Sequence, residues 1–430
     1  MSKVKTMNIA IRNGRVIDPA NNLDQITDLF ISDGKIAAIG QPPAEFMADQ
    51  EIDASNLVVS PGLIDLCANL REPGYSRKGT IASETAAAAA GGITTLCMPP
   101  MTKPIADNTA VIDLIEDLAK QAGNARVLPI GALTQELKGE QLSPMYGLSK
   151  AGCIGFTNAR EPIHSSLTLS RCLEYAATHD LLVIFQPQDA DLAAGGTMHD
   201  DTTCTRLGLS GIPESAETIE VARCLLLIEQ TGVKAHFGQL SCERSVKMVM
   251  DARARGLRVT ADIAIQNLLL TDENVSGFDP NFHLIPPLRS QLDRAGLRHA
   301  LVADGFQAIC SDHQPHELAA KQAPFAATEP GMTGLETLLS LSLMLVQQEL
   351  ISLPQMLAKL TSGPASVLNL DLGTLTPGST ADICIFDPQQ DWVLTTENRR
   401  SAGANTPFMG FPLKGVVRYT LLEGNVVFQQ

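Results

Sequence analysis

The stretch PGLIDLCANLREPG, residues 61–74, carries the strongest structural signal in the sequence. Residues 62–66 are apolar apart from Asp65, and they lie between a proline-glycine pair and the polar turn REPG. A short apolar run bounded by turn residues is typical of a strand buried on both faces. In a barrel of parallel strands, the catalytic and binding residues lie directly after the carboxyl ends of the strands. Residues 67–71 are therefore candidate functional positions.

Seven further apolar runs follow this strand, and segments of helical length separate most of them. The strands we expect span residues 62–66, 94–98, 126–131, 155–157, 182–185, 234–239, 258–262 and 308–311. The helices we expect include residues 80–90, 109–121, 166–179, 216–230, 245–255 and 334–349. Buried strands that alternate with crossover helices indicate a parallel sheet, and eight of them predict an α/β fold of the (β/α)8 TIM-barrel type.

Both ends of the chain have a different character. The first 60 or so residues contain short strand patterns separated by the turn pairs Asn13-Gly14 and Asp33-Gly34, and similar patterns return between residues 382 and 428. Two β-rich ends around a different middle predict one small β-sandwich domain built from both ends. The expected boundaries are residues 1–58 and 369–430 for the two parts of the β-sandwich, and 59–368 for the barrel.

Composition excludes several classes of protein. With 430 residues, 44% hydrophobic and 18% charged, the chain has a globular composition and can bury a large core. The 32 basic and 47 acidic residues give a formal charge of −15 and form no basic run, so we expect no nucleic-acid partner. No apolar stretch approaches the roughly 20 residues of a membrane helix, and the first residues lack a secretory signal. The expected location is cytoplasmic, away from membranes.

The cysteines argue against a disulfide framework. Their number is odd, nine, and they are spread from Cys67 to Cys384 without a CxxC pair. Such a pattern is typical neither of a small disulfide-bonded domain nor of a zinc finger. We expect buried free thiols.

Motifs along the chain resemble those of dihydroorotases, which belong to the amidohydrolase superfamily. The matching motifs are the stretch at 61–74, AAAGGITT at 88–95, LGLSGIPESAE at 207–217, PPLR at 286–289, SDHQPH at 311–316, GMTGLET at 331–337, GSTADICIFD at 378–387 and NTPF at 405–408. The resemblance covers essentially the whole chain, in order. It implies a metal-dependent hydrolase barrel with a small β domain.

The resemblance also implies where the metal ligands should lie, and here the sequence departs from the family. In dihydroorotases, metal ions at the strand ends activate water and polarise the amide carbonyl. Five of the six matching positions carry other residues, namely Cys67, Asn69, Asn158, Gln186 and Gln239, whereas the acid Asp312 is retained. Amides are poor zinc ligands, which leaves Cys67 and Asp312 as the only convincing ones. We therefore predict that the zinc site is lost, that no cofactor binds and that no residue is catalytic.

Part of the substrate-binding set persists. The resemblance implies that Arg71 and His316 match residues that hold the dihydroorotate carboxylate, whereas Pro100 replaces an asparagine of that set. A remnant anion site at Arg71 and His316 is one interpretation. The other is that Arg71 pairs with Glu72 or Asp65 while Asp312 and His316 cap a turn.

These observations favour a catalytically inactive dihydroorotase homologue. As the resemblance implies, proteins of this type assemble with the catalytic chain of aspartate carbamoyltransferase in pyrimidine biosynthesis, so homo- and hetero-oligomers are expected. One alternative is an active amidohydrolase with an atypical or absent metal site, in which Asp312, His313 and His316 supply the general acid and base. Another is a binding subunit that senses a pathway metabolite through Arg71 and His316.

Overall fold

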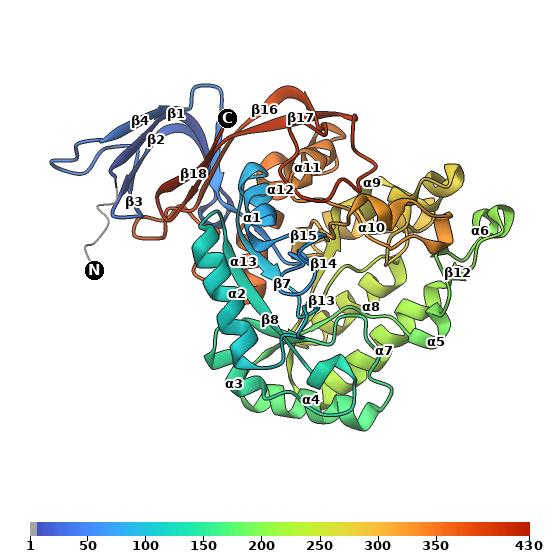
Figure 1. Cartoon of the computed structure of the whole chain (residues 1–430). Helices are drawn as coiled ribbons and strands as arrows, with labels where there is room; N and C mark the ends of the chain where they lie inside the picture. The colour runs from blue at the N-terminus through green and yellow to red at the C-terminus, as the bar shows by residue number, and fades with distance from the viewer. Residues whose placement is uncertain (1–6) are drawn as a thin grey trace.

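The protein is described by a computed structural model that covers residues 7–430 and contains a parallel barrel (Figure 1). Its strands hydrogen-bond in chain order, and all eight lie where the sequence predicts them. They are β6 (Leu63–Asp65), β7 (Ile93–Met98), β8 (Arg126–Ala132), β9 (Gly155–Thr157), β10 (Leu182–Phe185), β13 (Lys234–Phe237), β14 (Val259–Ala264) and β15 (Ala308–Cys310). The prediction of a (β/α)8 barrel is confirmed.

The ring of strands closes just beyond the carboxyl ends of β6 and β15. Ala68 forms a parallel bridge with His313. The Asn69 amide donates to the His313 carbonyl at 2.8 Å, and the His313 amide donates to the Cys67 carbonyl at 3.2 Å. The residues that follow the first strand are thereby fixed against those that follow the last one.

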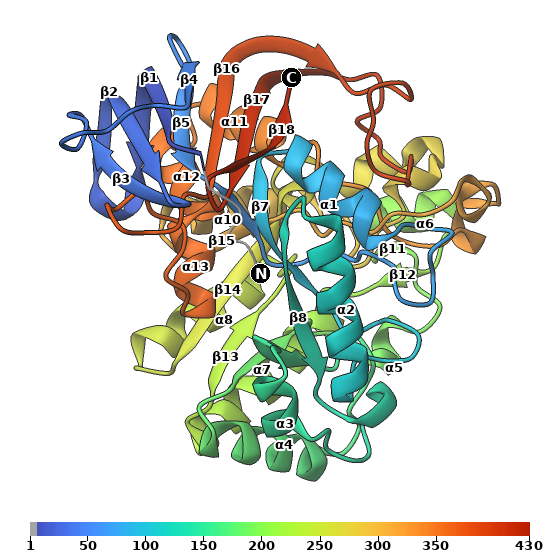
Figure 2. The same ribbon diagram turned by 60° about the vertical axis from the view of Figure 1, so that its left-hand side comes forward.

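Helices cover the outside of the barrel, and Figure 2 shows α1 and α2 along the outer face of β7 and β8. The longer helices are α1 (Ile81–Ala90), α2 (Thr109–Ala122), α4 (Ser166–Thr178), α7 (Glu214–Thr231), α8 (Glu243–Ala254), α10 (Gln291–Val302), α11 (Leu338–Gln347), α12 (Leu353–Leu360) and α13 (Ser362–Leu368). Shorter ones are α3 (Met145–Lys150), α5 (Ala190–Ala193), α6 (Thr202–Leu207) and α9 (Ile265–Leu269). The expected start of α11 at residue 334 is wrong, because residues 334–337 form a turn whose Gly334 amide binds the His313 ring.

Strands from both ends of the chain form a second sheet, in the order β18-β17-β16-β5-β1-β2-β3, with β4 beside β1. These strands are β1 (Ile9–Asp18), β2 (Leu23–Ser32), β3 (Lys35–Ile39), β4 (Gln50–Asp53), β5 (Val58–Pro61), β16 (Ile383–Val393), β17 (Pro412–Leu422) and β18 (Asn425–Gln429). Their buried side chains, such as Ile11, Ile31 and Ile385, form one apolar cluster. The sheet-rich second domain is confirmed, whereas its expected boundaries stay a prediction.

Among residues 7–430, no helix is long and apolar enough to cross a bilayer. All nine cysteines are buried and free, as the sequence predicts. Burial raises the pKa of each thiol, to about 12 for Cys153 and Cys172 and well above its ordinary value for Cys67.

The native protein should therefore resist thiol reagents. The thiolate is the reactive form, and both burial and a raised pKa suppress it. We expect an aromatic disulfide reagent at pH 8 to label essentially no thiol of the folded chain, and all nine after denaturation in guanidinium. Rapid labelling of even one native cysteine would contradict the packing described here.

Candidate active site at the barrel mouth

Four of the six family ligand positions meet at the carboxyl end of the barrel. Gln186, directly after β10, donates from Nε2 to the Oε1 atom of Gln239, which follows β13. The same Nε2 atom lies 3.7 Å from the Cys67 Sγ atom, which in turn lies 3.8 Å from Asp312 Oδ1. The side chains at these positions thus bind one another in a continuous chain across the mouth.

A buried carboxylate, that of Asp262, binds one member of this chain of contacts. Asp262, near the middle of β14, accepts from the Gln239 amide at 2.7 Å and from Cys310 Sγ at 3.4 Å. Its other oxygen lies 2.9 Å from His236 Nε2, and His236 Nδ1 contacts Thr260 at 2.8 Å. Asp262 and His236 are both 1% exposed. The family motifs give no signal for Asp262, because none of the stretches that match them contains it.

The two asparagines at family ligand positions are used differently. The Asn158 side chain accepts from Thr134 Oγ1 at 2.6 Å, and its Nδ2 atom donates to the Leu137 and Glu161 carbonyls at 3.1 and 2.9 Å. Asn158 therefore ties together the loops after β8 and β9. Asn69 is buried on the extension of β6, where its backbone takes part in closing the barrel.

Asp312 is the only acid at these six positions. It is 5% exposed and accepts a hydrogen bond from Gln314 Nε2 at 3.1 Å. Burial raises its pKa to about 6, although the positive charge of Arg160 and the Gln314 hydrogen bond favour the ionised form. A buried acid that titrates near neutral pH is a candidate for proton transfer.

Backbone strain also gathers at the mouth. Asp312, Gln239 and Arg71 have φ angles of 47°, 51° and 67°, in the left-handed region that few residues other than glycine adopt. Such conformations persist where the surrounding structure imposes them, and they cluster at functional sites. The backbone at the mouth is thus held in a conformation that costs free energy, although most residues at the metal-ligand positions differ from those of the family.

The remnant substrate residues Arg71 and His316 lie together. Arg71 Nε donates to the Pro315 carbonyl at 3.0 Å, and its Nη2 atom lies 3.1 Å from His316 Nε2. The alternative ion pairs of Arg71 with Glu72 or Asp65 do not form, since Glu72 accepts from the Ile81 amide and Asp65 from Ser311.

The environment of His316 keeps its ring neutral. Nε2 lies 2.9 Å from the Pro330 carbonyl, to which it donates, so Nδ1 accepts from Lys78 Nζ at 3.2 Å. Burial and the charges of Arg71 and Lys78 lower the pKa of His316 to about 3. A ring with that pKa does not act as a general acid near neutral pH. The expected turn cap by Asp312 and His316 is also wrong, because Asp312 contacts Cys67 and Gln314 instead.

The donor set at the mouth does not fit the zinc of the dihydroorotases. Within residues 7–430, no group of three or more His, Cys, Asp or Glu side chains is placed to hold a metal ion. The mouth offers one thiol, one carboxylate and two amides that bind each other. Zinc prefers imidazole, thiolate and carboxylate, and the raised pKa of Cys67 disfavours its thiolate.

Comparison with known proteins identifies the family. Residues 56–245 match a family model described as dihydro-orotase-like, and residues 252–428 match one described as amidohydrolase family. A dihydroorotase-like protein of Pseudomonas aeruginosa is 54% identical over 98% of this chain and 100% of its own length. The chain belongs to the dihydroorotase-like family of amidohydrolases. A protein named dihydroorotase from Syntrophus aciditrophicus is 41% identical over 99% of this chain and 100% of that protein.

Solved structures agree with the fold of this dihydroorotase-like chain. An L-hydantoinase from Arthrobacter aurescens superposes with a TM-score of 0.88 over 98% of this chain and 96% of its own. Its sequence identity is 23%, so the likeness concerns the fold alone.

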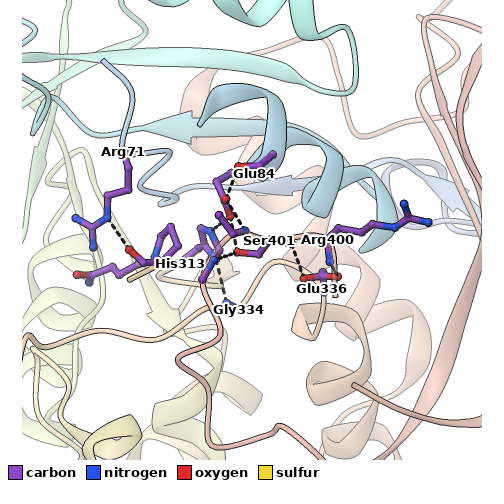
Figure 3. Close-up of polar contacts among 12 residues, drawn as sticks. Arg71, Glu84, His313, Gly334, Glu336, Arg400 and Ser401 are labelled. Carbon is purple, nitrogen blue, oxygen red and sulfur yellow. Dashed lines mark hydrogen bonds and ion pairs between the residues drawn. The ribbon is translucent and has the colours of Figure 1, made fainter. Parts of the chain in front are cut away.

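The first histidine of the SDHQPH motif, His313, serves the scaffold of the dihydroorotase-like chain. His313 is fully buried, and its Nδ1 atom accepts from the Gly334 amide at 3.1 Å. Its Nε2 atom therefore carries the proton and donates to Glu84 Oε2 at 2.8 Å (Figure 3). Because both ring nitrogens are engaged, His313 is not available as an acid or base at the mouth.

Glu84 is the centre of this first buried network, which we call the Glu84 network. Its carboxylate accepts from Ser401 Oγ at 2.6 Å and from the Ala402 amide at 3.0 Å, and the neighbouring Glu336 binds the Arg400 and Ser401 amides (Figure 3). Burial favours the neutral acid, but the bonds from His313, Ser401 and Ser83 bring the pKa of Glu84 below its ordinary value. The network joins α1, the turn after β15 and the segment before β17.

A second buried network joins two other family motifs, and we call it the Glu217 network. Glu217, in the first turn of α7, accepts from the Ser241 and Cys242 amides at 3.1 Å and from the Ser241 hydroxyl. Arg289 of the PPLR motif donates to Ser241 Oγ at 3.0 Å and to the Ile212 carbonyl at 2.9 Å. The motif residues that this chain keeps therefore hold loops of the barrel in place.

Residues 195–203, which follow α5, are partly ordered as secondary structure. They contain the strand β11 (Met198–His199), which pairs with β12 (Gly211–Ile212), and the start of α6. His199 Nδ1 lies 3.2 Å from Arg289 Nη1, so this segment is attached to the Glu217 network.

Proposed function

We propose that this dihydroorotase-like chain is a non-catalytic homologue that serves as a structural partner of the aspartate carbamoyltransferase catalytic chain in pyrimidine biosynthesis. The observation that carries the proposal is the chain of contacts from Gln239 through Gln186 and Cys67 to Asp312. These contacts connect the residues at former ligand positions to one another. They replace a set of metal ligands by a set of mutually bonded amide, thiol and acid groups.

The chemistry of ring opening supports inactivity. A bound metal lowers the pKa of water from 15.7 to about 7 and polarises the amide carbonyl, which is worth several kcal/mol of transition-state stabilisation. Of the three groups considered for acid and base catalysis, His313 is engaged in the scaffold and His316 stays neutral. Asp312 alone would have to replace both the metal and a second proton-transfer group.

The two buried networks support a scaffold role. The Glu84 and Glu217 networks contain family motif residues that this chain keeps, His313, Glu217 and Arg289, and neither network includes a member of the chain of contacts at the mouth. They hold the loops of the barrel and, through Ser401, the segment that leads into β17.

The second candidate function is a working cyclic amidohydrolase, and one observation favours it. Asp312 has a pKa of about 6 and lies at the mouth, where a general base would be expected. Relatives named dihydroorotase, at 39 to 41% identity, are consistent with this candidate. The two functions differ in whether the purified chain turns over dihydroorotate.

Restoring two histidines should not restore catalysis. In the double variant Cys67→His and Asn69→His, the remaining positions still carry Asn158, Gln186 and Gln239, which cannot complete the shell of ligands. We expect no ring opening of dihydroorotate above that of a boiled sample, with zinc, manganese or cobalt added. The wild-type chain under the same conditions is the control. Measurable turnover by the variant would show that two histidines suffice to form a working metal site, which would contradict the proposal.

Assembly is tested by the mass of the complex in solution. Light scattering after size exclusion should be measured for the purified chain, for the aspartate carbamoyltransferase catalytic chain from the same organism, and for their mixture. The proposal predicts a stable mixed species much heavier than either component. Two independent peaks at micromolar concentration would remove the assembly part of the proposal and leave the inactivity part to be judged by the assay.

A further inference from the structure

A cavity lies beside the mouth, between the loops after β9 and β10 and the helices α4 and α7. Its volume is about 360 Å³, and binding pockets for small molecules typically range from about 300 to 1,000 Å³. Arg71 and His316, the remnant substrate residues, are not among the residues that line it. The cavity is therefore separate from the remnant substrate pair.

Arg160, a partly buried residue, lines the cavity and has hydrogen-bonding capacity to spare. Its Nη2 atom is buried and has no hydrogen-bond partner among residues 7–430. The other arginine of the cavity, Arg223, differs in this respect. It donates to the Ser166 hydroxyl, the Glu220 carboxylate and the Ile163 carbonyl. A buried donor without a partner is unfavourable, and a ligand that accepts from it would remove that cost.

The walls of the cavity restrict the kind of ligand. Ile184, Phe185 and Leu169 provide apolar surface, and Gln188 also lines the space. The acids Glu161, Asp189, Asp191 and Glu220 line it as well, and they disfavour anions with several charges. A planar carboxylate matches the paired donors of a guanidinium. We propose that this cavity binds a small monocarboxylate with an apolar body, whose carboxylate binds Arg160.

This site is independent of the proposed assembly function. Binding of a ligand at this site requires no catalysis. The two residues at family ligand positions that line it, Asn158 and Gln186, already form hydrogen bonds within the chain. A ligand here would contact α4 and α7 on one side and the mouth loops on the other.

Calorimetry with a matched pair of probes tests the site. Benzoate and benzamide have the same shape, but only benzoate carries a charge for Arg160. We expect saturable binding of benzoate to the full chain, binding of benzamide at least roughly tenfold weaker, and a similar loss for benzoate in Arg160→Gln. Equal affinity for both probes, unchanged affinity in the variant, or no saturable binding of benzoate would overturn the proposal. Tighter binding of inorganic phosphate than of benzoate would overturn the monocarboxylate class.

A second variant keeps the test valid if Arg160→Gln does not fold. Ile219, on α7, lines the cavity and is 48% exposed, so Ile219→Trp should fill the entrance and abolish benzoate binding while Arg160 remains. Leu226, on the same helix, is 69% exposed and does not line the cavity, so Leu226→Trp is the matched control with unchanged binding. Equal binding by both tryptophan variants would place benzoate elsewhere on the protein.

Discussion

Glu217→Ala is expected to lower the free energy of unfolding by about 3–5 kcal/mol, the usual cost of removing one partner of a buried ionic network. Glu217 is 3% exposed, and its loss leaves the Ser241 and Cys242 amides without their acceptor and removes the carboxylate that lies 3.8 Å from the buried Arg289 guanidinium. Urea unfolding followed by circular dichroism measures the change. The expected midpoint is well below that of the wild type.

The control for this variant comes from the same turn of α7. Glu214 also lies in the first turn and is only partly buried, and Glu214→Ala should cost less than about 1 kcal/mol. If the two variants unfold at the same urea concentration, the Glu217 network does not stabilise the barrel.

Glu84→Ala is expected to have an effect of similar size, about 3–5 kcal/mol. The variant leaves the protonated Nε2 of His313, the Ser401 hydroxyl and the Ala402 amide without an acceptor inside the protein. Unfolding in urea at pH 7 measures the loss. The matched control is Glu229→Ala, whose 55% exposed side chain makes one long ion pair with Arg255 and should cost less than about 1 kcal/mol.

The contribution of Glu84 to the free energy of unfolding should decrease as pH falls. Its pKa in the folded state is below its ordinary value, so the folded protein favours the ionised carboxylate. The stability that ionisation contributes is present above the ordinary pKa of about 4.3 and is lost as pH falls through the lower folded value. The difference between wild type and Glu84→Ala should therefore shrink in acid. A constant difference from pH 7 to pH 3 would contradict the assigned network.

The sequence predicts the barrel and the meeting of four site residues for one physical reason. Apolar runs mark parallel strands, and the carboxyl ends of parallel strands meet at one end of a barrel. Cys67, Gln186 and Asp312 each follow such a run and Gln239 is the last residue of one, so their proximity could be inferred before any coordinates were known. A different pattern, short strands separated by turn pairs at both ends of the chain, predicts that the two ends share one β-rich domain, and strands from both ends do pair in the second sheet.

Other features of the site depend on which partner each side chain binds, and the sequence does not specify that. Asn158 follows a strand as the others do, yet Thr134 and the Leu137 carbonyl hold its side chain. His313 stands in a motif that suggests chemistry, but Gly334 and Glu84 use both of its ring nitrogens. Thr134, Leu137 and Gly334 lie at least 21 residues away in sequence, outside the strands and α-helices, where the conformation has no periodic pattern. Glu84 lies on α1, 229 residues from His313.

The central claim is that the barrel mouth holds no working metal centre, and side-by-side reconstitution tests it most directly. This chain and the dihydroorotase of Syntrophus aciditrophicus should be stripped of metal, incubated with zinc, desalted, and assayed for bound zinc and for ring opening of dihydroorotate. We predict far less than stoichiometric zinc in this chain and turnover no greater than that of a boiled sample. Stoichiometric zinc together with turnover would contradict the account and establish this chain as an active amidohydrolase.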